Sequence, residues 1–427
     1  MLSKVVREKI GELKIQDGEY NEYKKLYSNV VEVLKKSCRM LKVKAEVFVG
    51  GSFAKRTVIR SDDYDVDVFI RFHDSKKNIS DLTERVVKKT CGKLKLTYKR
   101  VHGSRDYFQI LLRHGSKNVT FEIVPVKKIK RPRDAENVTD LSYFHVSYVK
   151  KKLKGFEEQV LLAKAFCTAH GVYGAESYIH GFSGYALECL IIHYKSFVKM
   201  LRGLSKVKDG EKIVIDPAKH YKNKQEALIH LNESKLKSPI ILIDPTYKER
   251  NAISSLSVES FEKFQKEARE FLAHPKISDF EIKIRDIEMM KERAGKMKAD
   301  FVSVVLTTDR PAGDIAGTKM QKFSKFAEQK IEEKFEILDK VFEYNGEQEA
   351  RVFFVLKSRG FVLRKGPPVN MKDSVQVFRQ MHKHSFVKDN HFWAKIEIKE
   401  SAKEFLTSLS HDNKQLEEMS IKEMIVN

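Results

Sequence analysis

The sequence predicts an α+β protein built from several domains. Three observations support this class. Acidic and apolar residues alternate around residue 65, as in a β-strand; the region after residue 145 has helical periodicity; and the region after residue 256 returns to a mixture of helix and strand patterns. A chain of 427 residues is long enough for about two to four domains with their own cores.

The first part of the chain carries the clearest pattern. Apolar residues at spacings of three and four predict two helices before the first strand, and a third helix after the acidic strand. Two paired strands are expected next. In chain order the predicted elements are the helices Ser3–Leu13 and Tyr20–Leu41, the strand Asp65–Ile70, the helix Ile79–Cys91 and the strands Tyr98–Arg113 and Val119–Val126.

The acidic strand places two carboxylates on one face. Side chains alternate faces along a strand, so Asp65 and Asp67 point the same way, roughly 6 to 7 Å apart, and Val66 faces the core. Such a pair can hold two divalent ions about 3.5 to 4 Å apart, an arrangement that serves displacement at phosphorus. Oxygen ligands suit Mg²⁺. The segment Thr120–Pro125 supplies a third acid, because Glu122 alternates with apolar neighbours.

A glycine-rich turn precedes the acidic strand. Gly50, Gly51 and Ser52 follow a short apolar run. Backbone N–H groups and a hydroxyl in such a turn can approach a triphosphate closely, because glycine has no Cβ. Together, the turn and the three acids predict a catalytic site for phosphoryl chemistry.

Two other interpretations of the acids were weighed. An acid-x-acid pair alone usually marks a solvated strand face. The spacing also imitates the start of a calcium-binding EF-hand loop, but Val68 stands where that loop requires glycine. We therefore exclude calcium.

Composition indicates a polyanionic partner. Lys and Arg number 81 against 59 Asp and Glu, a formal net charge of +22, which favours nucleic acid over a merely solubilising surface. The four cysteines are far apart and lack a C-x-x-C motif, so neither zinc nor disulfides are indicated and a cytoplasmic location is expected. No stretch has the length and apolarity of a membrane span, so no membrane partner is expected.

Further elements are predicted beyond the acid strands. A basic run, Lys127–Arg133, is either a solvated loop or a phosphate contact. Asn345-Gly346 predicts a tight hairpin turn. The remaining predicted elements are the helix Val258–Ala273, the strand Phe301–Leu306, the helix Lys319–Phe335 and the hairpin strands Ile337–Tyr344 and Arg351–Leu356.

Two sets of motifs resemble known families. The GGS, DVD and FEIVP segments resemble the catalytic domain of the DNA polymerase β nucleotidyltransferase superfamily. From His145 the likeness narrows: HVSYV, and LLAKAFCTAHGVYGAESYIHGFSGYALECLIIHY over 161–194, are similar to the archaeal, class I CCA-adding enzymes. Asp244-Pro245, Arg250-Asn251 and the GPP of 366–368 fall where that family carries DP, RN and GPP.

The resemblance implies an architecture with four parts. These are a polymerase-β-like catalytic head at 1–148, a helical neck at 149–256 that binds the nucleotide, an α/β body resembling an RNA-recognition sheet at 257–330 and 393–427, and a tail at 331–392 that grips the tRNA elbow.

It also implies roles for individual residues. Asp65, Asp67 and Glu122 would be the catalytic acids and would hold two Mg²⁺ ions. Arg250 would read the base edge. The other nucleotide-binding residues would be Gly51, Ser52, Lys55, His145, Lys164 and Tyr173. The family usually has aspartate at the position of Glu122, and its His-Pro-Tyr segment falls on Arg105-Asp106-Tyr107, so no histidine is transferred there.

The implied activity is addition of the 3′-terminal CCA to tRNA. The substrates would be CTP, ATP and a tRNA lacking all or part of CCA, and the enzyme, a CCA tRNA nucleotidyltransferase, would form a homodimer. The tRNA 3′-hydroxyl would attack the α-phosphorus and release pyrophosphate. Two alternatives remain: another template-independent transferase, such as a poly(A) or oligoadenylate synthase, and a tRNA-binding protein that has lost catalysis.

Overall fold

The computed structural model describes residues 1–73, 78–208, 210–282 and 286–427. The chain divides into two compact units, residues 1–283 and 284–427. Each unit contains both helices and strands, which confirms the predicted α+β class. Within the described residues, no helix has both the length and the apolar character needed to cross a membrane.

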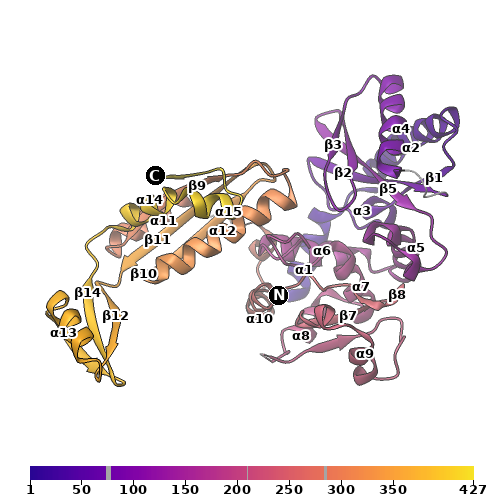
Figure 1. The fold of residues 1–427 in the computed structure, drawn as a ribbon. Coiled ribbons are helices and arrows are strands. Elements are labelled where there is room, and N and C mark those ends of the chain that lie inside the picture. The colour runs from indigo at the N-terminus through magenta and orange to yellow at the C-terminus, as the bar shows by residue number, and fades with distance from the viewer. Residues whose placement is uncertain (74–77, 209, 283–285) are drawn as a thin grey trace. The chain divides into compact units, whose positions relative to one another are not determined.

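The first unit opens with a five-stranded sheet in the order β1-β2-β5-β4-β3 (Figure 1). Strands β2 and β5 run parallel, and the other neighbouring pairs are antiparallel. Helices α2 and α4 bury apolar side chains against one face of this sheet. The bounds are α1 Leu2–Leu13, α2 Asp17–Met40, β1 Ala45–Val49, α3 Gly51–Lys55, β2 Asp63–Phe72, α4 Ile79–Leu94, β3 Tyr98–Val101, β4 Tyr107–His114 and β5 Lys117–Lys127.

The rest of the first unit is mainly helical. Its core gathers fully buried aromatic side chains, including Phe166, Phe197 and Phe264, from three different helices. Two short 3-10 turns, Pro132–Asp134 and Val138–Leu141, lead into it. The bounds are α5 Ser142–Lys152, α6 Glu157–Ala169, α7 Gly184–Tyr194, α8 Phe197–Leu204, β6 Ile213–Ile215, α9 Lys224–His230, β7 Ile240–Asp244, β8 Tyr247–Asn251 and α10 Val258–Ala273.

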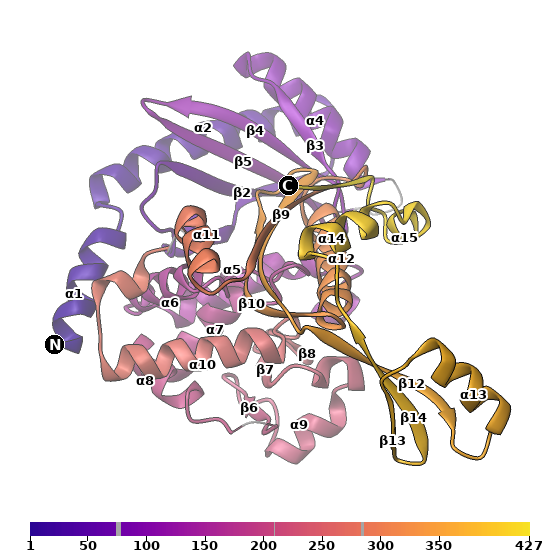
Figure 2. The ribbon, with the colours of Figure 1, turned by 90° about the vertical axis from the view of Figure 1, so that its left-hand side faces the viewer.

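The second unit contains two sheets (Figure 2). A four-stranded sheet, β10-β11-β9-β15, packs against α12 and α14, and a three-stranded sheet, β12-β14-β13, packs against α13. The bounds are α11 Ile287–Lys296, β9 Asp300–Thr307, α12 Asp314–Glu332, β10 Phe335–Tyr344, β11 Glu349–Ser358, β12 Phe361–Pro368, α13 Lys372–Met381, β13 Ser385–Lys388, β14 His391–Glu397, α14 Ala402–Ser410, α15 Asn413–Glu418 and β15 Glu423–Val426.

The expected domain limits differ from these units in two places. Helix α10, expected in the body, contributes Phe261 and Phe264 to the helical core of the first unit. Strands β10 and β11, expected in the tail, belong to the same sheet as β9. In both places long-range packing sets the limit, and the linear pattern does not reveal it.

The predicted hairpin exists, but its turn is longer than expected. Residues 345–348 connect β10 and β11. Gly346 has a positive φ of 91°, whereas Asn345 does not and instead accepts a hydrogen bond from the Glu347 amide through its side chain. The Asn-Gly pair therefore forms part of a four-residue loop and not a two-residue turn.

Phe53 offers a test of the head core. Its side chain is fully buried, and the ring lies 5.7 to 6.3 Å, centroid to centroid, from the rings of Tyr20, Tyr23, Tyr27 and Tyr64. We expect Phe53→Ala to lower the free energy of unfolding by about 3 to 5 kcal/mol, because it opens a cavity that rigid neighbours cannot fill.

Circular dichroism in a denaturant series measures this loss. The single tryptophan, Trp393, lies on β14 in the other unit, so its fluorescence follows that unit separately. Phe361→Ala, which truncates a 43 % exposed phenylalanine, is the matched control and should change stability by about 0.5 kcal/mol or less. An unchanged circular-dichroism midpoint for Phe53→Ala would show that the head core does not depend on this ring.

Candidate active site

The three acids lie on one face of the head sheet. Strands β2 and β5 pair in parallel register, so Asp67 stands directly opposite Glu122, and Asp65 opposite Thr120. Val66 and Val68 point into the core with 1 % and 0 % exposure, as do Phe121 and Ile123 on β5. The predicted alternation in both strands is therefore confirmed, and it gives the three carboxylates a common side.

These carboxylates form no ion pairs within the described residues. No lysine, arginine or histidine of the described segments forms an ion pair with Asp65, Asp67 or Glu122. Loss of solvent raises the pKa of all three. Repulsion from Asp63 adds to the shift at Asp65, and repulsion from neighbouring acids of the set adds to it at Asp67 and Glu122. Lys55 opposes the shift at Asp67, and a hydrogen bond from Gln109 opposes it at Glu122. The site concentrates negative charge.

Gln109 fixes the third acid. It lies across from Glu122 in the antiparallel β4–β5 pair, and its Nε2 donates a hydrogen bond of 3.0 Å to Glu122 Oε1. In the structure as described, no three His, Cys, Asp or Glu side chains converge closely enough to form a ready-made single-ion site. A pair of ions shared among carboxylates and substrate oxygens does not require that convergence.

The glycine turn packs against the acid strand. Gly51 has φ 56°, and a Cβ added there would lie 1.7 Å from Asp67 Oδ2. The Gly50 N–H donates a hydrogen bond of 2.9 Å to the Asp67 carbonyl, and a Cβ on Gly50 would collide with the Phe69 ring. Both glycines are thus required by their close approach to β2. The same turn begins helix α3, which carries the predicted residues Ser52 and Lys55.

The predicted residues Lys55 and Lys164 are linked by a network of buried hydrogen bonds. Lys55 Nζ donates a hydrogen bond of 2.7 Å to Glu188 Oε2, and Lys164 Nζ donates one of 2.8 Å to the Thr57 carbonyl. Thr57 Oγ1 donates to Glu188 Oε1 at 2.9 Å and completes the connection. Burial lowers the pKa of Lys164 to about 8, although Glu188 opposes the shift.

Tyr173 lies beside Lys164 at the start of α7. A Cβ added to Gly184 would be 3.1 Å from the Tyr173 hydroxyl and 3.6 Å from Lys164 Cε, so both side chains border the first turn of that helix. The Tyr173 backbone forms a bridge with Phe182, which closes the Gly-Val-Tyr-Gly loop. Burial raises the pKa of the Tyr173 phenol.

His145 and Arg250 converge on Asp244. Asp244 Oδ2 accepts 2.7 Å and 3.1 Å contacts from Arg250 Nη1 and His145 Nε2, and Oδ1 accepts a 2.9 Å hydrogen bond from the Tyr185 hydroxyl. The His145 and Tyr185 rings stack at 3.9 Å. Burial lowers the pKa of His145, against the pull of Asp244, and His145 and Arg250 together hold the Asp244 pKa below its usual range.

Helix α7 connects these groups. Its Glu188 holds Lys55 and Thr57, and its Tyr185 holds Asp244 and stacks on His145. No local sequence pattern indicates a role for Tyr185, Thr57 or Gln109. Glu188 is the only acid in the apolar run ALECLII, and this was the one feature of the sequence that could have indicated a functional role for it.

Two basic segments near the third acid are engaged in ion pairs. Arg105 forms a buried ion pair with Asp140. In the basic run, Lys127 pairs with Glu136, Lys128 with Glu46 and Arg131 with Asp134. Of the two interpretations of this run, a solvated loop and a phosphate contact, these pairs favour the loop.

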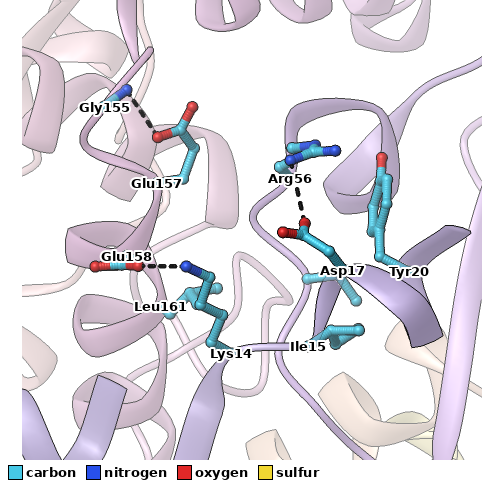
Figure 3. A pocket seen from close by; sticks show the side chains of 10 residues that line it. Lys14, Ile15, Asp17, Tyr20, Arg56, Gly155, Glu157, Glu158 and Leu161 are labelled. Atoms are coloured by element: carbon cyan, nitrogen blue, oxygen red, sulfur yellow. Dashed lines mark hydrogen bonds and ion pairs between the residues drawn. The ribbon is translucent and has the colours of Figure 1, made fainter. Parts of the chain in front are cut away.

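A separate pocket of about 300 Å³ lies between the α1–α2 link and the start of α6 (Figure 3). Its two basic side chains are already paired, Lys14 with Glu158 at 2.8 Å and Arg56 with Asp17 at 3.6 Å. Figure 3 shows Arg56 beside the Tyr20 ring, 4.7 Å from its centroid. The third carboxylate of the lining, Glu157, accepts a hydrogen bond of 2.8 Å from the Gly155 amide.

The raised pKa of Asp67 leads to a prediction about the stability of the metal-free protein. Because its folded pKa lies above the ordinary value of 3.8, the charged carboxylate opposes folding at neutral pH. We expect Asp67→Asn to raise the thermal midpoint of the metal-free protein at pH 7.5. The gain should shrink as the pH falls through the folded pKa and vanish below about 3.8.

Calorimetric melts in a chelator measure this effect. Asp62→Asn, at an exposed position just before β2, is the control and should leave the midpoint nearly unchanged. A destabilised Asp67→Asn protein at neutral pH would show that Asp67 is compensated by a partner.

Two family models match the chain. Residues 158–281 match the model for tRNA nucleotidyltransferase, second domain, and residues 2–143 match that for the Second Messenger Oligonucleotide or Dinucleotide Synthetase domain. The first match covers most of the helical part, and the second covers the sheet with the acids. Together the two matches span most of the first unit.

Curated relatives are archaeal enzymes. The chain is 42% identical over 245 residues to the CCA-adding enzyme of Nanoarchaeum equitans, which covers 57% of this chain and 58% of that protein. It is 29% identical over 341 residues to the CCA-adding enzyme of Methanosarcina barkeri, which covers 78% and 71% of the two chains. The chain thus spans less than two thirds of the length of the first of these relatives.

A solved cytoplasmic RNA terminal U-transferase overlaps 66% of this chain at 15% identity with a TM-score of 0.47, too low to support an assignment. The sequence relatives and the family model for the helical part agree. This chain is similar to archaeal CCA-adding enzymes.

Proposed function

We propose that this protein adds the 3′-terminal CCA to tRNA from CTP and ATP without a nucleic-acid template. The observation that carries the proposal is the acid face, where Asp65, Asp67 and Glu122 stand together without a cationic partner in the described structure. The CCA-adding relatives supply the identity of the substrates. The net charge of +22 is consistent with tRNA as the partner.

The acid face fits divalent cations. Its donors are all carboxylate oxygens, and burial, with repulsion from neighbouring carboxylates, raises their pKa values. Asp65 and Asp67 would hold both of two Mg²⁺ ions, and Glu122 would share one of them. When bound, such ions neutralise charge on the phosphates and lower the pKa of an attacking hydroxyl.

The protein's own groups orient the nucleotide. Ser52, Lys55, Lys164 and Tyr173 would hold the triphosphate, since two ammonium groups and two hydroxyls suit phosphate oxygens. The backbone of Gly51 would approach those oxygens. The tRNA 3′-oxygen then forms a bond to the α-phosphorus as the bond to the bridging oxygen breaks, and pyrophosphate leaves. Catalysis consists mostly of positioning and charge neutralisation.

Base selection would depend on Arg250. Its guanidinium is held by Asp244 at 2.7 Å, and Asp244 is itself held by His145 and Tyr185. A guanidinium fixed on one side can still donate from its other N–H groups to a base edge. We propose that His145 acts through this cluster, by orienting Asp244.

The larger parts of the chain have proposed roles as well. The head would carry catalysis and the neck would bind the nucleotide. The second unit, with its body and tail, would bind the tRNA, the tail at the elbow. A homodimer and a cytoplasmic location remain predictions.

Labelled CTP and ATP, separately and together, test the function on a tRNA that ends at its discriminator base. We expect two added nucleotides with CTP alone and three with both, in the presence of Mg²⁺. Asp67→Ala should lower incorporation on the order of 10³-fold or more while tRNA binding is retained, because the charge that holds the ions is lost. Asp62→Asn is the control and should keep its activity.

Three results would contradict the proposal. Unlimited tailing with ATP alone would identify a poly(A)-type transferase. Tight tRNA binding without any product would identify a binding protein that has lost catalysis. Near-normal incorporation by Asp67→Ala would show that the acid face is not the active site.

A further inference from the structure

Glu188 is a buried carboxylate that the proposed chemistry does not use. It lies in the second turn of α7, fully inaccessible to solvent, and its chain neighbours Leu187 and Cys189 are also buried. Burying a carboxylate is costly unless it is paired and hydrogen-bonded. The choice of its partners therefore indicates what it does.

Both carboxylate oxygens of Glu188 accept hydrogen bonds from the part of the site that is proposed to hold the triphosphate. Oε2 accepts from Lys55 Nζ at 2.7 Å, and Oε1 accepts from Thr57 Oγ1 at 2.9 Å. Lys164 Nζ donates to the Thr57 carbonyl at 2.8 Å and lies 3.4 Å from its hydroxyl. One carboxylate on α7 thus binds Lys55 of α3 directly and reaches Lys164 of α6 through Thr57.

The ammonium groups of Lys55 and Lys164 lie in the same poorly solvated region and need a negative charge nearby. The Lys55 side chain is 11 % exposed, and Lys164 is 6 % exposed. Burial, with a smaller contribution from Lys55, lowers the pKa of Lys164 to about 8, and Glu188 is the strongest influence in the opposite direction. Like charges in a poorly solvated region repel strongly, so the carboxylate is what allows both ammonium groups to stay in place.

Both lysines also act on the acid face. Lys55 and Lys164 each lower the pKa of Asp67, so both ammonium groups lie within electrostatic reach of the carboxylates. Lys164 further borders the first turn of α7 beside the Tyr173 hydroxyl. A polyphosphate next to the acid face would meet these groups together.

We propose that Glu188 is a positioning residue that holds Lys55 and, through Thr57, Lys164 for the triphosphate of the incoming nucleotide. This inference rests on the proposed function. If Glu188 had a purely structural role, its loss would weaken the binding of every nucleotide equally. In a positioning role, its loss should weaken only the binding of the triphosphate, which the lysines hold. The distinction can be measured without catalysis.

The experiment compares the affinities of CTP and CMP, with Mg²⁺ and without tRNA. Glu188→Gln keeps the volume and the contact with Thr57 but removes the charge that holds Lys55. We expect the dissociation constant for CTP to rise about 10- to 100-fold, in the range set by a charged hydrogen bond, and that for CMP to change less than about threefold. Calorimetry measures CTP, and competition against CTP measures CMP.

Three further variants sharpen the test. Glu188→Asp should recover part of the CTP affinity, because it restores the charge one methylene short. Thr57→Val removes the hydroxyl between Glu188 and Lys164 with a neutral, isosteric change and should lower CTP affinity selectively, which gives a second route if Glu188→Gln folds poorly. Glu328→Gln breaks a 2.6 Å ion pair with Lys340 in the other unit and should leave both affinities unchanged.

The outcomes separate this inference from the proposed function. Equal losses for CTP and CMP, or no loss, in both Glu188→Gln and Thr57→Val would overturn the role of Glu188 while wild-type CTP binding and tRNA extension stand. A wild-type protein that neither binds CTP nor extends tRNA would overturn the proposed function and this inference with it.

Discussion

The parallel pairing of β2 with β5 is the constraint on which the site depends. In that register Asp67 faces Glu122, and the opposite sides of the same strands form the core beneath α2 and α4. The core fixes the register, because a slip by one residue would bury the acids and expose the apolar set. The sheet therefore holds like charges together that would separate on a flexible loop, and its burial energy offsets their repulsion.

One helix, α7, connects the residues that are proposed to bind the nucleotide. Helix α7 is apolar along most of its length, and its two polar contacts, Glu188 and Tyr185, reach α3 and the Asp244 cluster. It links the groups proposed for the triphosphate to those proposed for the base. Because these contacts come from segments far apart in the chain, the site forms only when the head and the helical part fold against each other.

The sequence was informative where the pattern is local. Period-two alternation predicted the faces of β2 and β5, and the glycine turn was found from its composition. The sequence pattern explains Gly51 only by the approach of the turn to a triphosphate. The structure adds a second reason, the close approach of Gly51 to Asp67, which no linear pattern reveals. Lys164, Tyr173 and Arg250 were identified through family resemblance, since each residue type is common in ordinary helices and loops.

Long-range contacts were the part that could not be predicted. The role of Glu188 depends on Lys55, 133 residues away, and that of Asp244 on His145 and Tyr185, 99 and 59 residues away. The limits of the body and tail were misplaced for the same reason: β10 and β11 resemble any hairpin until their pairing with β9 is known. Non-local strand pairing leaves little trace in composition or periodicity.

Titration of Mn²⁺ by calorimetry tests the central claim, that the acid face is an uncompensated cation site. The wild-type protein should bind Mn²⁺ with saturable heat and gain thermal stability, because the ions remove the repulsion among Asp65, Asp67 and Glu122. Asp67→Asn should lose most of both effects. Equal heats and equal stabilisation in the two proteins, or none in either, would contradict the account.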